Sequence, residues 1–165
     1  MIDWRPILGS LLAASAAARE ERERAELRER LERARRLIDA RYDQPLELEQ
    51  IARAACLSPY HFHRLFRREF DDTPHQYLTR RRVERARELL LRSDLPITDV
   101  CFRVGFQSLG SFSALFRRHA GHSPARYRAL VVQSLGVDGP APLLAPIPSC
   151  FYRMFAHPRA DASAV

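Results

Sequence analysis

The stretch "FHRLFRREFDDTPHQY", Phe62–Tyr77, returns fifty residues later as "FSALFRRHAGHSPARY", Phe112–Tyr127, without a gap. Both copies contain Leu-Phe-Arg-Arg, and both end in a hydroxyl residue followed by Pro-x-x-Tyr. A hydroxyl residue before a proline marks a helix start, because the first caps the helix and the second suits its first turn. The repeat therefore predicts two copies of one helical unit.

A shorter match precedes each copy. "IARAACLS", Ile51–Ser58, aligns with "VCFRVGFQS", Val100–Ser108, once one residue is added to the second. Each unit is thus predicted as a short helix, a tight turn, a longer helix and a capping helix. Residues 76–94 are predicted as one long linker helix that holds the copies at a fixed separation. No stretch alternates like a strand, so we expect an all-α fold of two helix-turn-helix units.

The two ends of the chain differ in character. Residues 19–36 alternate acid and base, with pairs four apart such as Glu20 with Arg24 and Glu26 with Arg30, which predicts a solvated helix. Its heptad seam fails upstream, which leaves open only a short dimerising contact through Leu27, Leu31, Ala34 and Ile38. The end after Leu130 carries five prolines and an aromatic cluster that covers the domain or meets a partner, with the residues Ile147, Phe151, Tyr152 and Phe155.

These changes in composition define three parts. They are an N-terminal charged helical extension (1–34), a central domain with helix-turn-helix units at about 46–70 and 96–120 (35–130), and a Pro-rich tail (131–165).

The net charge of +7 is concentrated in the central domain. Residues 35–130 contain 18 Arg against 11 Asp and Glu, whereas the remainder balances at 9 against 9. Such a domain attracts polyanions such as nucleic acid. The three cysteines are widely spaced, which fits a reducing cytoplasm better than a disulfide framework. The apolar run at residues 7–18 is too short to span a membrane.

The first long helix has two distinct sides at 100° per residue. Its apolar residues predict a core face, made of Phe62, Leu65, Phe66 and Phe70. The opposite face carries Tyr60, His63, Arg64 and Arg67. An arginine can donate two parallel hydrogen bonds to guanine, and tyrosine and histidine can contact base edges or phosphates. A projecting helix of this kind, after a short helix and a tight turn, fits the major groove of DNA.

The motifs resemble those of one known family. They are Leu46-x-Leu-x-x-Ile-Ala, Leu57-Ser58-Pro59, Arg64-Leu65-Phe66, Pro74-x-x-Tyr77, Val104-Gly105-Phe106, Phe116-Arg117-Arg118 and Ser123-Pro124-x-x-Tyr127-Arg128. In this order they resemble the DNA-binding domain of AraC/XylS-type transcription regulators over roughly residues 35–129. The resemblance implies a seven-helix, bipartite homeodomain-like fold that inserts two recognition helices into successive major-groove segments of a promoter.

By that resemblance, site residues can be assigned in both units. The implied base-reading residues are Tyr60, His63 and Arg64 in the first unit and Leu109, Gly110, Ser113 and Ala114 in the second. The expected contacts to the DNA backbone are Ser58, His61, Arg67, Gln107, Ser108, Ser111 and Arg117. The large readers of the first unit are small in the second, so we expect the first to supply most direct base readout and the second to grip phosphates.

One turn departs from the family pattern. The position that is often glycine in this family is Cys56 in the first unit, while the second unit keeps Gly105. A cysteine at that position has to tolerate or avoid a positive φ.

The expected partners are double-stranded promoter DNA and RNA polymerase, with no cofactor, no metal and no membrane. The sequence resembles the single-domain kind of regulator, a cytoplasmic, nucleoid-associated monomer or weak dimer without enzyme activity.

Several alternatives remain. The chain could be a protein-interaction module with only nonspecific DNA affinity. A remote alternative is an alkyl-acceptor DNA repair protein, since "IPSCFYR" around Cys150 faintly resembles an acceptor motif but lacks its histidine. Thiol sensing by Cys101 or Cys150 is a further possibility. His61 and His63 cannot share a metal ion, because residues two apart on a helix diverge by about 200°.

Overall fold

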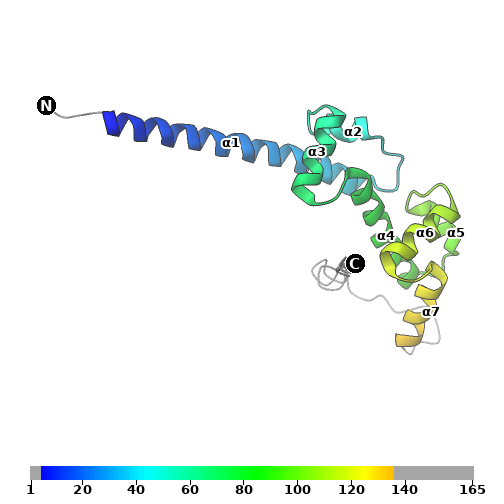
Figure 1. Ribbon diagram of the computed structural model, residues 1–165. Coiled ribbons are helices and arrows are strands. Elements are labelled where there is room, and N and C mark those ends of the chain that lie inside the picture. The colour runs from blue at the N-terminus through cyan, green and yellow to red at the C-terminus, as the bar shows by residue number, and fades with distance from the viewer. Residues whose placement is uncertain (1–4, 136–165) are drawn as a thin grey trace, which may run out of the picture. The chain divides into compact units, whose positions relative to one another are not determined.

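The computed structural model describes residues 5–135, with side chains placed for 14–131 and for residue 133. In this part of the chain there are seven helices and no strand (Figure 1). The all-helical prediction is confirmed. The helices are α1 (Arg5–Ala40), α2 (Leu48–Ala54), α3 (Pro59–Phe70), α4 (Pro74–Arg92), α5 (Ile97–Arg103), α6 (Leu109–Ala120) and α7 (Pro124–Leu135).

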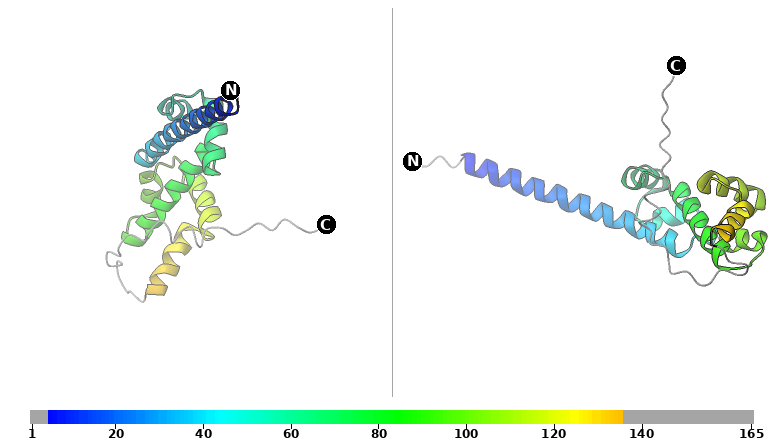
Figure 2. Two further views of the ribbon diagram at one scale, coloured as in Figure 1. Left: turned by 90° about the vertical axis from the view of Figure 1, so that its left-hand side faces the viewer. Right: turned by 90° about the horizontal axis from the view of Figure 1, so that it is seen from below.

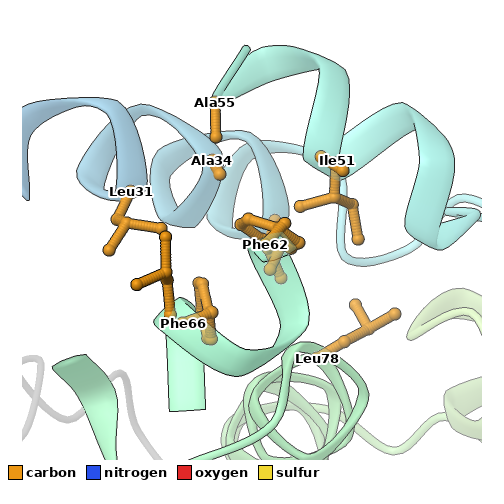
Figure 3. Close-up of a cluster of buried hydrophobic side chains, with 10 residues drawn as sticks. Leu31, Ala34, Ile51, Ala55, Phe62, Phe66 and Leu78 are labelled. Carbon is orange, nitrogen blue, oxygen red and sulfur yellow. The ribbon is translucent and has the colours of Figure 1, made fainter. Parts of the chain in front are cut away.

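The chain divides into two compact units, the first ending at Leu78 and the second beginning at Thr79. The first unit buries one face of α1 against α2, α3 and the first turns of α4 (Figure 3). Its core is made of Leu31, Ala34, Ile38, Ile51, Ala52, Ala55, Phe62, Leu65, Phe66 and Leu78. The apolar spacing within α3 therefore predicted the buried side of that helix correctly.

The second unit has its own core, built on the later turns of α4, on α5 and on α6. The buried residues are Val83, Ala86, Leu90, Val100, Cys101, Val104, Phe106, Phe112 and Phe116. Phe112 and Phe116 hold the positions that Phe62 and Phe66 hold in the first unit, fifty residues earlier. The two repeated segments thus fold alike.

The N-terminal helix is where the structure differs from our expectation. A helix with solvated sides was predicted through residue 36, but Leu31 and Ala34 are 2% and 0% exposed. The N-terminal part of α1 does run free of α2 and α3 (Figures 1 and 2), and the described side chains before Leu27 are exposed. Of the four residues through which a short dimerising contact was left open, Leu31, Ala34 and Ile38 are buried in the first core.

The structure also extends the repeat. The last turns of α1, "RLERARRLI" (Arg30–Ile38), and the last turns of α4, "RVERARELL" (Arg82–Leu90), align with an offset of 52 residues. Each segment buries three side chains at the same spacing in its own unit. A unit therefore consists of the end of a long helix, two helices of a helix-turn-helix and the start of the next helix.

The start of the next helix is fastened by a tyrosine in both units. The Tyr77 hydroxyl at the start of α4 donates to the Asp39 carboxylate on α1, with 3.1 Å to each oxygen. In α7, the Tyr127 hydroxyl accepts a hydrogen bond from Arg87 Nε of α4 at 3.1 Å. Both rings also meet a core phenylalanine edge to face, Phe66 and Phe116 respectively. The Pro-x-x-Tyr motif thus closes each unit onto its first helix.

Candidate nucleic-acid interface

The longer helix of the first unit, α3, has well-defined ends. Ser58 is its N-cap, with Oγ accepting a hydrogen bond from the His61 amide at 3.4 Å, and Pro59 occupies the first turn. Its C-cap, Asp71, has the left-handed φ of 59° and donates its amide to the Arg67 carbonyl at 2.9 Å. The Ser-Pro signal in the sequence therefore placed the start of α3 correctly.

The outward face of α3 carries the residues that the sequence proposed for base readout. Tyr60 is 79% exposed, which is unusual for so large a ring. His63, Arg64 and Arg67 are also exposed, and His61 lies beside them in the first turn. No described protein group covers these side chains enough to bury them. The face is therefore available to a ligand, whereas the roles of the individual residues remain predictions.

The longer helix of the second unit, α6, starts in the same way. Ser108 caps it by accepting from the Ser111 amide at 3.2 Å, and the Ser108 hydroxyl donates to Ser111 Oγ at 2.9 Å. Gln107 lies just before this cap and is exposed. The two serines proposed as phosphate contacts are thus hydrogen-bonded to each other, which leaves the Ser111 hydroxyl hydrogen free to point outward.

The outward face of α6 carries smaller side chains than that of α3. Leu109 is 40% exposed, Ser113 is half-buried, and Gly110, Ala114 and Arg117 are exposed. A Cβ placed on Gly110 would meet no heavy atom within 4 Å, so the space above this residue is open. Of the side chains on this face, only Arg117 can donate a charge-assisted hydrogen bond.

The turn that leads into each of these helices needs a residue in the left-handed region. Gly105 fills that position in the second unit with φ 88°, and Cys56 fills it in the first with φ 52°. The cysteine therefore tolerates the positive φ. The conformation is unfavourable for a residue with a Cβ.

Sequence reasoning missed the side chain that supports the strained turn. Arg30 on α1 donates from Nε to the Ala55 carbonyl at 2.8 Å and from its terminal nitrogen to the Cys56 carbonyl. The sequence had paired this arginine with Glu26. The extended repeat offers a signal that could have found it, since Arg82 holds the equivalent position and stacks on Phe106, 5.7 Å from the ring centroid.

The other candidate chemistries find little support in the described residues. Among residues 5–135 no group of three or more His, Cys, Asp or Glu side chains could hold a metal ion. Burial raises the pKa of the Cys101 thiol, which keeps it protonated and unreactive. Cys150 and the cluster around Phe151 lie outside the described residues. No described helix is both apolar and long enough to cross a bilayer.

Comparison with families and curated proteins places the chain among regulators. A family described as a helix-turn-helix domain matches residues 51–130. The regulatory protein SoxS of Salmonella typhimurium is 33% identical over 91 residues, which cover 55% of this chain and 85% of SoxS. The bifunctional transcriptional activator and DNA repair enzyme AdaA of Bacillus subtilis is 33% identical over 93 residues, covering 56% of this chain and 44% of AdaA.

The lengths of these relatives limit what the likeness covers. The chain spans 44% of the length of AdaA and between 33% and 38% of the length of four further curated relatives, whose names describe them as regulators or activators. The likeness therefore concerns one region of those proteins.

Solved structures show the same likeness in three dimensions. The DNA-binding domain of AdpA, a global transcriptional factor crystallised in complex with a target DNA, is similar with a TM-score of 0.58 and 33% identity. The match covers 68% of this chain and 97% of the AdpA domain. With two helix-turn-helix units, an exposed basic helix and relatives of this kind, the chain belongs to the AraC/XylS family of helix-turn-helix transcription regulators and carries its DNA-binding domain.

Proposed function

We propose that this chain is a sequence-specific transcription regulator that inserts α3 and α6 into successive major-groove segments of promoter DNA. The observation that carries the proposal is the outward face of α3, where Tyr60, His63, Arg64 and Arg67 are all exposed. These residue types can read base edges in the major groove, and no structural need of the fold explains an exposed tyrosine beside them.

The two recognition helices divide the work. In the first unit Tyr60, His63 and Arg64 contact base edges, with Arg64 donating to a guanine. In the second unit the small side chains of Ser113 and Ala114 and the bare backbone of Gly110, together with Leu109, add shape and methyl contacts. Phosphates are held in both units, by Ser58, His61, Arg67, Gln107, Ser108, Ser111 and Arg117.

We extend the proposal to the setting in which the domain acts. The DNA-binding domain comprises residues 35–130 together with the part of α1 from Leu27 that packs into the first core. Residues 1–34 otherwise form an extension, and residues 131–165 a Pro-rich tail. The protein acts in the cytoplasm at the nucleoid, as a monomer or weak dimer that meets RNA polymerase at promoters. It performs no catalysis, and it needs no cofactor.

The decisive experiment is selection of bound fragments from random duplex DNA, in the presence of competitor DNA at physiological salt. A preferred sequence with protection over two neighbouring helical turns is the expected result. Binding without any preferred sequence would instead support the interaction module with nonspecific DNA affinity. Protection over a single turn would show that only one unit reads DNA.

The salt dependence of binding separates phosphate contacts from base contacts. Arg67→Ala and Arg117→Ala should each reduce the slope of log K against log salt by about 1, without changing which sequence is preferred. A change of preference in either variant would show that the arginine touches a base.

A further inference from the structure

The turn between α2 and α3 is held from outside by the half-buried side chain of Arg30. Two guanidinium nitrogens of this arginine donate to two successive carbonyls, those of Ala55 and Cys56. Ala55 is the C-cap of α2, and Cys56 is the residue with positive φ. One side chain of α1 therefore binds the bend that joins the two helices of the first helix-turn-helix unit.

These carbonyls are good acceptors. The last carbonyls of a helix lack partners within the helix and carry the negative end of its dipole, so they attract a cation. A guanidinium offers parallel donors in a rigid plane, which fits two neighbouring oxygens better than a flexible ammonium does. The two bonds thus fix the direction of both peptide groups in the bend.

The position of the bend determines where α3 begins. Only Leu57 and the cap residue Ser58 lie between Cys56 and the first residue of α3. Tyr60 and His63 project from the first turns of that helix, the part closest to the bend. A rotation of the Cys56 peptide would therefore move those side chains directly, and readout of base edges depends on side chains held in place by their supporting contacts.

Helix α1 also contacts the far end of α3. Arg28 forms an ion pair with Glu69 at 2.9 Å, and the guanidinium of Arg35 lies over the Phe70 ring, 5.4 Å from its centroid. Between these ends, Phe62 and Phe66 are buried in the core that α1 shares. The recognition helix is thus held by α1 at both ends and along its inner face.

The second unit supplies an independent parallel. Arg82, at the position equivalent to Arg30, lies over the ring of Phe106, the residue after Gly105 in the turn. Both units therefore direct an arginine from the preceding long helix to the bend before the recognition helix. The recurrence of this placement indicates that it serves the bend rather than the solvent.

We propose that Arg30 is a positioning residue for base readout: through the carbonyls of Ala55 and Cys56 it sets the orientation of α3, without touching DNA. This inference rests on the proposed function, because base readout by α3 is what the orientation serves. It also couples α1 to the DNA surface, since its two hydrogen bonds connect α1 to the bend after which Tyr60 and His63 project.

The test compares Arg30→Met and Arg30→Lys with the matched control Arg33→Met, which removes an exposed arginine of the same helix. Affinity is measured for the selected duplex and for duplexes altered in either half-site. The half-site of the first unit is the one at which Arg64→Ala flattens preference. Arg30→Met should lower discrimination there by about tenfold and leave the other half-site unaffected. Arg30→Lys should be intermediate, and Arg33→Met should match the wild type.

Three results would overturn the inference. Unchanged discrimination at the first half-site in Arg30→Met would show that the two hydrogen bonds of Arg30 do not orient α3. Equal losses at both half-sites would indicate general destabilisation. A salt slope reduced by about 1 would make Arg30 a phosphate contact. Helicity and thermal unfolding show whether Arg30→Met folds. If it does not, Arg30→Lys provides the test, and discrimination between half-site sequences equal to that of the wild type would contradict a positioning role for Arg30.

Amide hydrogen exchange separates this inference from the proposed function. In the free protein, Arg30→Met should exchange faster than Arg33→Met at the amides of Cys56 and Leu57, which close the bend. If the wild type selects no DNA sequence, the proposed function fails, whereas the exchange result still shows whether Arg30 holds the bend. If selection succeeds and exchange is unchanged, only the role of Arg30 is refuted.

Discussion

The two helix-turn-helix units bury equivalent side chains but differ where the chain bends and where it meets solvent. Both left-handed positions of the first unit are held by residues with a Cβ, Cys56 and Asp71, whereas the second unit uses Gly105 and Gly121. The recognition helix of the first unit presents large polar groups, and that of the second presents small ones. The buried side chains are thus similar in the two units, whereas the residues of the turns and of the outward faces differ. Two units can therefore share a fold without sharing a role.

The largest effect is expected in the cores, where the units are most alike. Phe66→Ala and Phe116→Ala should each lower the free energy of unfolding by about 3–5 kcal/mol, because both rings are fully buried. Phe66 contacts three aromatic rings and Phe116 two, so the first change should cost more. Urea unfolding followed by circular dichroism measures both. If Phe116→Ala hardly changed the free energy of unfolding, the two cores would not be equivalent.

The next largest effect separates the outer faces. Arg64→Ala should weaken binding to the preferred duplex by about 1–3 kcal/mol and flatten the preference at one base pair. Ala114→Ser, at the equivalent position of the second unit, should change sequence preference much less, because the methyl group of Ala114 makes no hydrogen bond to a base that the change would remove. Competition binding with single-substituted duplexes gives both numbers. A larger effect of Ala114→Ser would refute the proposed division of work.

The turns provide a reciprocal pair of changes. Gly105→Ala should destabilise the protein by about 1–2 kcal/mol, since a Cβ is unfavourable at φ 88°. Cys56→Gly should stabilise it by a smaller amount, about 0.5–1 kcal/mol, because relief of the same strain is partly offset by the greater freedom of glycine in the unfolded chain. Urea midpoints at an unchanged m value report both shifts. If Cys56→Gly destabilises, the thiol makes a contact that outweighs its backbone strain.

The smallest effect is expected on the outward face of α6, at Gly110. Gly110→Ala should stabilise the protein by about 0.4–1 kcal/mol, because the added methyl meets open space and glycine is a poor helix former. Affinity for the selected duplex should stay close to that of the wild type. A stabilised variant with clearly weaker DNA binding would show that the duplex approaches Gly110 too closely for a methyl group, which would sharpen the contrast with Tyr60.

Local signals allowed much of the fold to be predicted. Thr73-Pro74 and Ser123-Pro124 mark the starts of α4 and α7, and Ser58-Pro59 marks that of α3, because capping depends on neighbours in sequence. The apolar spacing in α3 likewise gave its buried residues Phe62 and Phe66. The outward residues of α3 followed from the same geometry, whereas those of α6 came from the family resemblance, and the contacts of both with DNA await the experiments above.

Tertiary contacts limited the prediction for α1. The alternation of acid and base predicted that Arg30 pairs with Glu26, but two backbone carbonyls of another helix's end bind it instead. The spacing of Leu27, Leu31, Ala34 and Ile38 fits a dimer seam and a core face equally well, and periodicity alone cannot identify the partner. The changing offset between the copies, 52 residues here and fifty later, also concealed the repeat of α1 in α4.

Helix α4 contributes Leu78 to one core and Val83, Ala86 and Leu90 to the other. The coil-to-helix equilibrium of α4 therefore enters the unfolding of both units. Loss of either core leaves half of this helix without its packing partners, and a short amphipathic helix is marginal in water without them. A substitution that destabilises the core of one unit should therefore lower the cooperativity with which the other unit unfolds.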